Sequence, residues 1–353
     1  MFDWLLRKKS KTQLGIDLGA SSIKIVELGR KEERAYLDNY ALLQSKSGKI
    51  FNIIDLKDED IIQLLAALIK EGNFAGRRAS VALPVDQTFS TVISLPVMPE
   101  EELAAAVTFE AQKYVPIPLN EVVLDWSIIT ADQNADQRRG TEHGAGDVVR
   151  SFAEVARTSG GKSQGDVDAI SEQGRNSTSG NIGAGTIQIL LLAVPKETIN
   201  RITRIVSRAG LKVAALEQEA FSLARSLIGN DKNTFMIVDL GRRGTDIILL
   251  DQGFIKLSHS LESVNKEIIF MEIDRIVNIF QMRYNKKIGQ CLLAGGRANE
   301  KDLFEFLTVK LKMPVRLGDP FARVSYDSKA GSFLKELGPQ FSVAVGLAMR
   351  DHG

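Results

Sequence analysis

The sequence predicts an α/β protein built from two related halves, and two observations support this prediction. Residues 15–24 read as a strand, a turn of small residues and a second strand, with Asp17 at the end of the first strand. A similar unit at residues 237–246 carries Asp239 in the corresponding position. Two strand–Asp–Leu–Gly–turn–strand units indicate two related halves that face one cleft.

The composition of the 353-residue chain excludes several classes of function. Hydrophobic residues make up 44% and charged residues 25%, which is typical of a globular protein with room for about two domains. A formal net charge of +1 argues against a nucleic-acid binder, which would need a basic excess. The single cysteine, Cys291, excludes an intramolecular disulfide and a cysteine-based metal site. No apolar run reaches the roughly 18 residues of a membrane-spanning helix, so we expect a cytoplasmic protein.

Residues 1–11 form an N-terminal tail in which the apolar residues Phe2, Trp4, Leu5 and Leu6 precede a basic run. A signal peptide has the reverse order, with charge before a longer apolar region. We expect a solvated tail, and peripheral contact with an anionic membrane surface is the alternative.

The first half begins with three predicted strands within residues 12–44, joined by short polar turns. A helix over 58–71 follows, with Asp58 as its expected cap and apolar residues recurring along one face. We assign residues 12–76 to the first subdomain of this half, together with a C-terminal helix within 340–353 that carries small residues for close packing.

Residues 77–217 show a different order of predicted strands and helices, and we assign them to an α+β subdomain inserted in the first half. Two β-rich runs, a helix that opens at Pro99 and ends before Pro116, and a strand make up its first part. Its last part reads as strand, helix and strand. Between them, residues 131–186 are rich in Gly, Ser, Asp, Gln and Asn. We expect a disordered loop there, because so few apolar residues cannot offset the entropy of ordering.

The second half, residues 218–339, begins with a helix and the second Asp-Leu-Gly unit. A hairpin and a long helix over 262–284 follow, with apolar residues on most turns of the helix. A buried strand then breaks at Gly295 and Gly296, which are expected to form a tight strand-to-helix turn before the next helix.

Each Asp-Leu-Gly unit carries the residue types of a phosphate and cation site. Backbone N–H groups and small hydroxyls of a glycine-rich turn can cradle phosphate, and a carboxylate at a strand end can hold a hydrated cation. The candidate binding residues are Asp17, Gly19, Ala20, Ser21, Ser22, Lys24, Asp239, Gly241, Gly244 and Thr245, with Asp17 and Asp239 as the metal ligands. The alternative is structural: the carboxylates cap turns, and the glycines serve turn geometry alone.

Further stretches make the chain recognisable. Phe109 to Pro118 reads FEAQKYVPIP, residues 191–196 and 220–225 continue the pattern, and residues 292–299 contain the Gly-Gly turn. The order of these motifs and of the two Asp-Leu-Gly units resembles the PilM family of actin-like type IV pilus assembly proteins, which is related to the cell-division protein FtsA. The resemblance covers nearly the whole chain except the low-complexity loop, and it implies an actin-like fold.

The resemblance implies ATP and Mg²⁺ as cofactors, with Gly295 and Gly296 at the turn that borders the nucleotide base.

Two features depart from the family pattern. Residues 258–263 run almost straight into the long helix, so we expect a reduced small subdomain in the second half, and this subdomain forms one wall of the adenine pocket in actin-like folds. Arg242 and Arg243 occupy a turn where the family has small residues, and they would either grip phosphate or fill the cleft with positive charge.

Two further positions carry alternatives. Gln218 or Glu219 lies where actin-like folds place the group that orients an attacking water, but we favour a surface position on a helix. Residues 114–118 are expected to be structural for the insert, and a place at the border of a partner groove is the alternative.

The resemblance implies a cytoplasmic scaffold of the type IV pilus assembly complex at the inner membrane. Such a protein binds the N-terminal cytoplasmic tail of a PilN-like membrane protein, in a groove between the first half and its insert. It connects that protein to the pilus motor and platform proteins, reaches the membrane only through its partners, and is at most a slow ATPase. Self-association is left open.

Two alternatives belong to other classes. An FtsA-like filament protein would end in an amphipathic membrane helix, and this chain ends at Gly353 without one. An actin-fold small-molecule kinase is favoured less, because no stretch offers a convincing catalytic base.

Overall fold

The computed structural model describes residues 12–32, 34–44, 56–130 and 185–352. The tail 1–11 lies outside the described residues, and so does the loop predicted over 131–186 apart from its last two residues.

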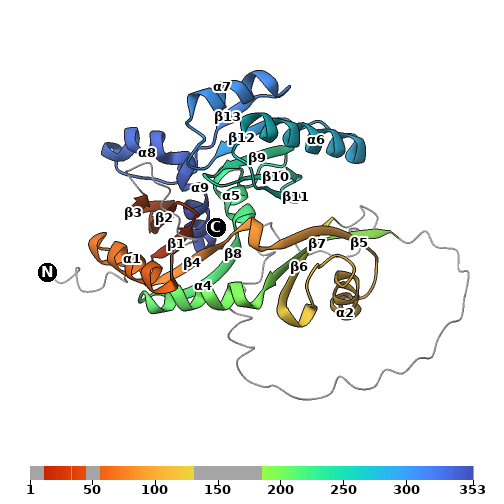
Figure 1. The fold of residues 1–353 in the computed structure, drawn as a ribbon, viewed down its shortest axis with the longest axis horizontal. Coiled ribbons are helices and arrows are strands. Elements are labelled where there is room, and N and C mark those ends of the chain that lie inside the picture. Colours follow the sequence, from red (N-terminus) through yellow and green to blue (C-terminus); the bar gives the residue numbers. More distant parts are fainter. Residues whose placement is uncertain (1–11, 33, 45–55, 131–184, 353) are drawn as a thin grey trace, which may run out of the picture.

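Two five-stranded sheets share one topology, which is the structural counterpart of the duplicated Asp-Leu-Gly unit (Figure 1). In each sheet three strands form an antiparallel meander, and two further strands add in parallel beside the first strand of the meander. The first sheet has the order β3-β2-β1-β4-β8, with β1 (Gln13–Leu18), β2 (Ser22–Lys31), β3 (Arg34–Gln44), β4 (Arg78–Leu83) and β8 (Lys212–Gln218). The second has the order β11-β10-β9-β12-β13, with β9 (Phe235–Leu240), β10 (Thr245–Asp251), β11 (Phe254–Leu261), β12 (Gln290–Ala294) and β13 (Val315–Leu317).

Helices cover the sheets through their apolar faces. On the first sheet these are α1 (Asp58–Glu71) and α4 (Lys196–Arg208), which bury residues such as Leu65 and Ile205. On the second they are α6 (Lys266–Tyr284) and α7 (Lys301–Lys310). Between the two sheets lie α5 (Glu219–Leu227) and α9 (Ser342–Ala348), whose buried side chains form a core shared by both halves.

Asp58 does not cap α1 as the sequence suggested. The helix begins at this residue, Lys57 takes the N-cap position, and the Asp58 carboxylate pairs with Arg201 and Arg204 of α4. Burial of Ile61 and neighbouring apolar residues holds α1 on the sheet, so the acidic first turn serves to attach α4.

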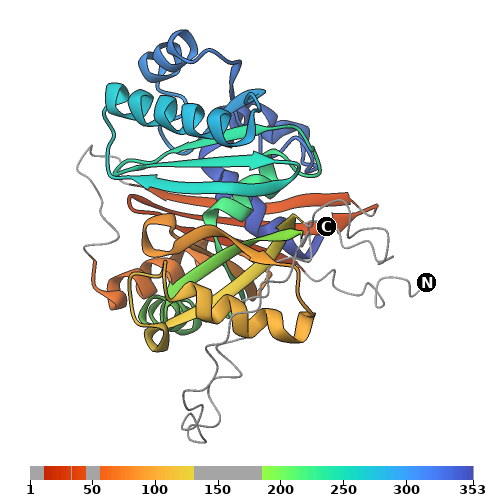
Figure 2. The same ribbon diagram turned by 90° about the vertical axis from the view of Figure 1, so that its right-hand side faces the viewer.

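The described residues of the insert form a three-stranded antiparallel sheet in the order β5-β7-β6, against which the helix α2 packs (Figure 2). Its elements are β5 (Phe89–Pro96), α2 (Glu100–Ala111), β6 (Val122–Thr130) and β7 (Thr186–Pro195). Within the range 77–217 assigned to the insert, β4 and β8 instead belong to the first sheet, because β4 pairs with β1 and β8 pairs with β4. Among the described residues the separate sheet therefore consists of β5, β6 and β7, and the division into domains stays a prediction.

The second half shows the reduction that the sequence predicted. β11 ends at Leu261 and α6 begins at Lys266, so residues 262–265 alone connect them. The C-terminal part adds α8 (Gly331–Leu337), and short 3-10 helices lie at η2 (Val85–Gln87), η3 (Leu119–Glu121), η5 (Ser328–Ala330), η6 (Gly338–Phe341) and η7 (Met349–His352).

Glycines allow the closest approaches at the junction of the two halves. A Cβ built at Gly346 of α9 would overlap the carbonyl oxygen of Ser222 in α5. One built at Gly15 of β1 would overlap the carbonyl oxygen of Ala344 in α9. The central helices are therefore packed backbone against backbone.

We expect the substitution Gly346→Ala to lower the free energy of unfolding by about 1–3 kcal/mol, because the added methyl group overpacks the helix crossing. Urea denaturation measures this loss. Gly331→Ala is the matched control, since a Cβ at that position meets nothing closer than 3.7 Å. Equal stabilities of the two variants would contradict the close crossing.

Candidate functional site

A cleft that is open to solvent lies where the turns of the two Asp-Leu-Gly hairpins face each other. Every candidate binding residue predicted from the sequence lines it except Thr245. The lining residues are Asp17, Leu18, Gly19, Ala20, Ser21, Ser22, Lys24, Gln44, Pro84, Asp86, Gln87, Glu219, Asp239, Gly241, Arg242, Arg243, Gly244, Asp246, Ser260, Gly295, Gly296, Pro339, Gln340 and Val343. Thr245 is fully buried, and its hydroxyl donates to the carbonyl oxygen of Ser263 at 3.1 Å.

The first hairpin presents a buried ion pair. Asp17 of β1 and Lys24 of β2 are register partners, and Lys24 Nζ lies 2.7 Å from Asp17 Oδ2. Burial lowers the pKa of Lys24, but the Asp17 carboxylate outweighs it, with help from Asp239 and Glu219, so the pKa lies above its usual value. Lys24 is therefore a fixed positive charge on the cleft floor.

Gly19 keeps the space beside this ion pair open. A Cβ at Gly19 would lie 3.4 Å from Asp17 Oδ1 and 3.6 Å from Lys24 Nζ. A ligand atom can occupy that space because the residue has no side chain.

The second hairpin presents two facing carboxylates, Asp239 of β9 and Asp246 of β10, which are register partners. Burial raises the pKa of Asp239 to about 7, with a further contribution from Asp246 and opposition from Lys24. Burial also raises the pKa of Asp246 to about 6, against a hydrogen bond from Ser260. Among the described residues, the buried Asp246 Oδ1 finds no hydrogen-bond partner.

Glu219 also faces the cleft, so the prediction of a surface position for it is wrong. Burial raises its pKa well above the usual value, and the nearby carboxylates Asp17, Asp246 and Asp239 add to the effect. The preceding Gln218 is buried and donates to Thr88 Oγ1 at 2.6 Å, which fixes the start of α5.

Sequence reasoning missed two acidic residues of this cleft, Asp86 and Asp246, and favoured the surface for a third, Glu219. Asp86 follows β4, and Glu219 follows β8, so both lie at the carboxyl ends of neighbouring parallel strands. Ligands of α/β folds commonly bind at such strand ends. The position of Asp86 and Glu219 just after a strand is a signal present in the sequence. It points to the cleft only once β4 and β8 are known to pair, and the local sequence does not show that pairing.

The charge balance of the cleft favours a cation together with an anion. Five carboxylates line it, from Asp17, Asp86, Glu219, Asp239 and Asp246. Against them stand Lys24, Arg242 and Arg243, and both arginines are exposed. Burial raises the pKa of Asp86, and Arg243 opposes this, which places that guanidinium near Asp86 of the other half.

The residues present fit a phosphate group with a divalent cation. Glycine turns offer backbone N–H groups, Lys24 offers an ammonium group, and Asp246 Oδ1 is a carboxylate oxygen in need of a partner. Within the described ranges, no cluster of three or more His, Cys, Asp or Glu side chains could hold a metal ion alone. A cation here would therefore depend on water and on the ligand for its other oxygens.

Gly295 is required for the turn that closes this cleft. Its φ is +87°, and a Cβ would overlap Asp239 Oδ1 and lie 2.6 Å from the carbonyl oxygen of Leu240. We expect Gly295→Ala to lower the free energy of unfolding by about 2 kcal/mol or more. Gly296→Ala should be nearly neutral, since a Cβ there meets nothing within 4 Å. Thermal melts of both variants test this contrast, and equal melting temperatures would contradict it.

No helix within the described ranges combines the length and the apolar character needed to cross a membrane.

Comparison with known proteins gives a family and a fold. Residues 15–140 and 261–352 match the family model described as type IV pilus assembly protein PilM. The solved PilM-PilN type IV pilus biogenesis complex contains a chain similar to this one, with a TM-score of 0.72 and 20% identity over 97% of this chain and 98% of that chain. Lower similarity is found to the ethanolamine utilization protein EutJ from Carboxydothermus hydrogenoformans, with a TM-score of 0.47 and 13% identity over 96% and 89% of the two chains. The cytoplasmic domain of EpsL of Vibrio cholerae gives a TM-score of 0.46 and 6% identity over 90% and 86%.

The predicted actin-like α/β fold of two related halves is thereby confirmed. The family model matches more than half of the chain and includes both the first hairpin and the helix of the insert. The chain belongs to the family of type IV pilus assembly proteins PilM.

Proposed function

We propose that this chain is a cytoplasmic scaffold of the type IV pilus assembly complex that binds the N-terminal cytoplasmic tail of a PilN-like inner-membrane protein. The observation that carries the proposal is the family match over residues 15–140, which takes in the insert as far as β6. The similar solved structure is a complex with PilN, which supports the choice of partner.

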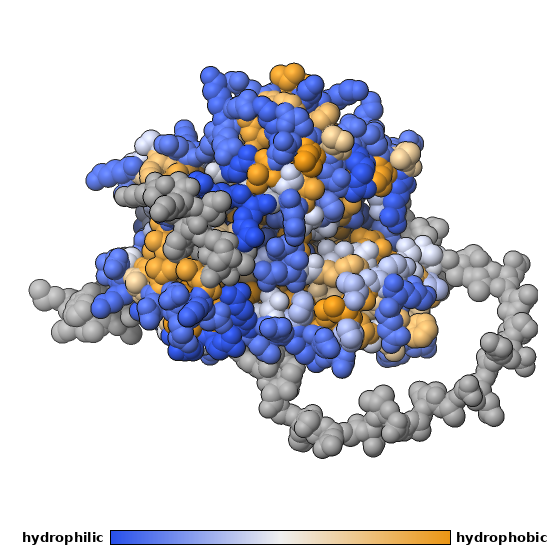
Figure 3. Space-filling view, viewed as in Figure 1, coloured by the Kyte–Doolittle hydropathy of each residue, from blue (hydrophilic) through white to orange (hydrophobic). Residues whose placement is uncertain are grey.

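An exposed apolar patch on the insert supports docking of such a tail. Phe109 of α2 is 66% exposed, and Tyr114 and Ile117 follow it in the segment before Pro118. We call these three residues the insert patch. In Figure 3 apolar residues lie among polar ones over the insert. An extended tail with apolar side chains would bury the insert patch. Residues 114–118 would then lie at the border of the partner groove.

A pull-down with an immobilised PilN-like tail peptide tests the proposal. The wild-type chain is expected to be retained, and Phe109→Ser should lower retention at least fivefold, because an interface loses most when a central aromatic residue is removed. Met282→Ser is the matched control, since Met282 is 80% exposed on α6 of the other half. No retention of the wild type, with or without ATP, would refute the proposal.

We further propose that ATP with Mg²⁺ in the cleft modulates the scaffold. Asp17 and Asp239 would hold the cation through water, the two hairpin turns would bind the phosphates, and Gly295 and Gly296 would border the base. Bound Mg²⁺ neutralises phosphate oxygens. The ligand would tune the conformation of the chain, because it would contact residues of both halves. We propose slow ATP turnover at most.

Location and further partners follow from the same role. We propose that the chain is cytoplasmic and reaches the inner membrane through the PilN-like protein, with pilus motor and platform proteins as further partners. Self-association is compatible with this role. The family match favours neither the FtsA-like filament protein nor the small-molecule kinase.

A further inference from the structure

The cleft offers charged and polar groups that suit the phosphates of a nucleotide, and few groups that suit its base. We infer that it recognises the phosphate chain and the cation of its ligand and does not discriminate between nucleobases. This inference rests on the proposed nucleotide site and defines its substrate class: a magnesium-bound triphosphate, with any base.

The described part of the lining offers no aromatic ring on which a base could stack. Among the described residues that line the cleft none is aromatic, and the apolar side chains are few, with Leu18, Pro84, Pro339 and Val343 as the largest. Sites that bind a flat ring normally supply apolar and aromatic walls with a few well-placed polar groups. The described residues of the cleft supply no aromatic wall.

The polar groups near Gly295 and Gly296 give no base-specific pattern. The carbonyl oxygen of Pro339 already accepts the Gly295 N–H at 2.9 Å. Gln340 is the amide side chain that the C-terminal segment contributes to the lining. An amide both donates and accepts hydrogen bonds and can rotate, so it matches the edge of adenine or of guanine.

Two cationic side chains of the second half, Arg297 and Lys266, are held by other residues outside the cleft. Arg297 donates to the carbonyl oxygen of Val264 at 3.0 Å and pairs with Glu300. Lys266, the first residue of α6, pairs with Asp302 of α7 at 2.7 Å. The short link 262–265 is thus tied to the Gly-Gly turn, and neither Arg297 nor Lys266 lines the cleft.

The groups that suit phosphate are, in contrast, numerous. The turns of both Asp-Leu-Gly hairpins, Lys24, Arg242 and Arg243 line the cleft, and guanidinium groups suit phosphate oxygens. The facing carboxylates of Asp17, Asp239, Asp246 and Glu219 repel a bare polyphosphate, so binding needs a divalent cation. Discrimination therefore depends on charge and on the number of phosphates.

Calorimetric titration of the full chain at pH 8 tests the inference with four probes: ATP, GTP, inorganic tripolyphosphate and adenosine. With Mg²⁺ we expect dissociation constants of ATP and GTP within about threefold, tripolyphosphate within about tenfold of both, and no heat from adenosine. Removal of Mg²⁺ should weaken each phosphate ligand at least tenfold.

A matched pair of variants refines the test. Arg242→Gln combined with Arg243→Gln should weaken ATP and tripolyphosphate by the same factor, about tenfold, whereas Arg316→Gln on β13, which does not line the cleft, should change neither. Binding of ATP at least tenfold tighter than both GTP and tripolyphosphate would overturn the inference and leave the proposed ATP site standing. Absence of heat from every ligand would overturn both the inference and the proposed ATP site. The proposed tail binding is tested separately by the pull-down.

Discussion

Replacement of Glu217 by alanine is expected to lower the free energy of unfolding by about 3–5 kcal/mol, the largest loss among the substitutions considered. Glu217 is 1% exposed at the end of β8 and accepts two hydrogen bonds from the Arg225 guanidinium of α5, at 2.7 and 2.8 Å. Arg350 approaches its other side at 3.5 Å. Removing the Glu217 carboxylate takes away a buried negative charge that both guanidinium groups face.

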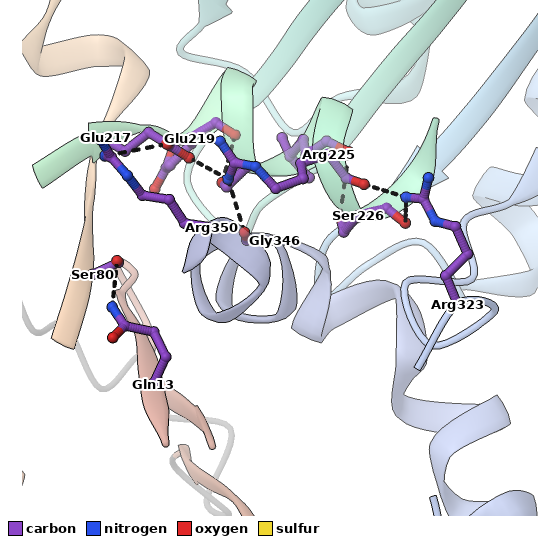
Figure 4. A network of polar contacts seen from close by, with 11 residues as sticks. Gln13, Ser80, Glu217, Glu219, Arg225, Ser226, Arg323, Gly346 and Arg350 are labelled. Carbon is purple, nitrogen blue, oxygen red and sulfur yellow. Dashed lines mark hydrogen bonds and ion pairs between the residues drawn. The ribbon is translucent and has the colours of Figure 1, made fainter. Parts of the chain in front are cut away.

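The network matters because it joins elements of the central junction (Figure 4). Arg225 also donates to the carbonyl oxygen of Gly346 in α9 at 2.8 Å. Arg323, from the segment before α8, donates to the carbonyl oxygens of Arg225 and Ser226. Glu217 thus holds the first sheet, both central helices and the C-terminal segment in one arrangement, two residues before Glu219 of the cleft.

Urea denaturation measures the effect, and two controls bracket it. Glu217→Gln keeps one acceptor and should lose less than the alanine variant. Glu59→Ala removes a solvent-exposed pair with Arg208 and should change the free energy of unfolding far less. A loss for Glu217→Ala no larger than that of Glu59→Ala would show that the buried network adds no stability.

The two hairpin aspartates are expected to respond in opposite directions to the same change. Asp17→Asn should lower the free energy of unfolding by about 3 kcal/mol, because Lys24, 9% exposed, loses the counter-charge 2.7 Å away. Asp239→Asn should raise it at pH 8 by about 1–2 kcal/mol. This gain is smaller than a pKa of about 7 alone would give, because solvent screens a half-buried carboxylate.

The pH dependence of the second variant has a definite sign. The pKa of Asp239 is about 7 in the folded state, above the ordinary value of 3.8. Between these values the folded state binds more protons than the unfolded state, so Asp239 costs stability as the pH rises from about 4 to about 7. The gain from Asp239→Asn should therefore be present at pH 8 and vanish near pH 4. A gain of equal size at pH 8 and pH 4, or a loss at pH 8, would contradict this assignment.

Sequence alone predicted the hairpins well because their signals are local. An Asp at a strand end, glycines in the turn and a second strand after it are neighbours in the chain, and the residues of both turns line one cleft. Lys24 was found for the same reason, since it is the register partner of Asp17 across the turn.

What the sequence did not predict depends on distant pairing. β4 and β8 are separated by the whole insert, and their pairing moves both strands into the first sheet and brings Asp86 and Glu219 into the cleft. Thr245 was placed wrongly because strand alternation turns it toward Ser263 and turns the next residue, Asp246, toward the cleft. Asp58 was read as a cap because its partners, Arg201 and Arg204, lie far along the chain.

The central claim is that one protein binds the tail and the nucleotide and couples the two. Titration of a PilN-like tail peptide into the full chain, with and without saturating ATP and Mg²⁺, tests it most directly. We predict saturable binding with one tail per chain, and a dissociation constant that changes at least fivefold between the two conditions, as expected for a coupling free energy of about 1 kcal/mol or more. Identical affinities in both conditions would contradict the coupling, and no binding in either would contradict the scaffold role itself.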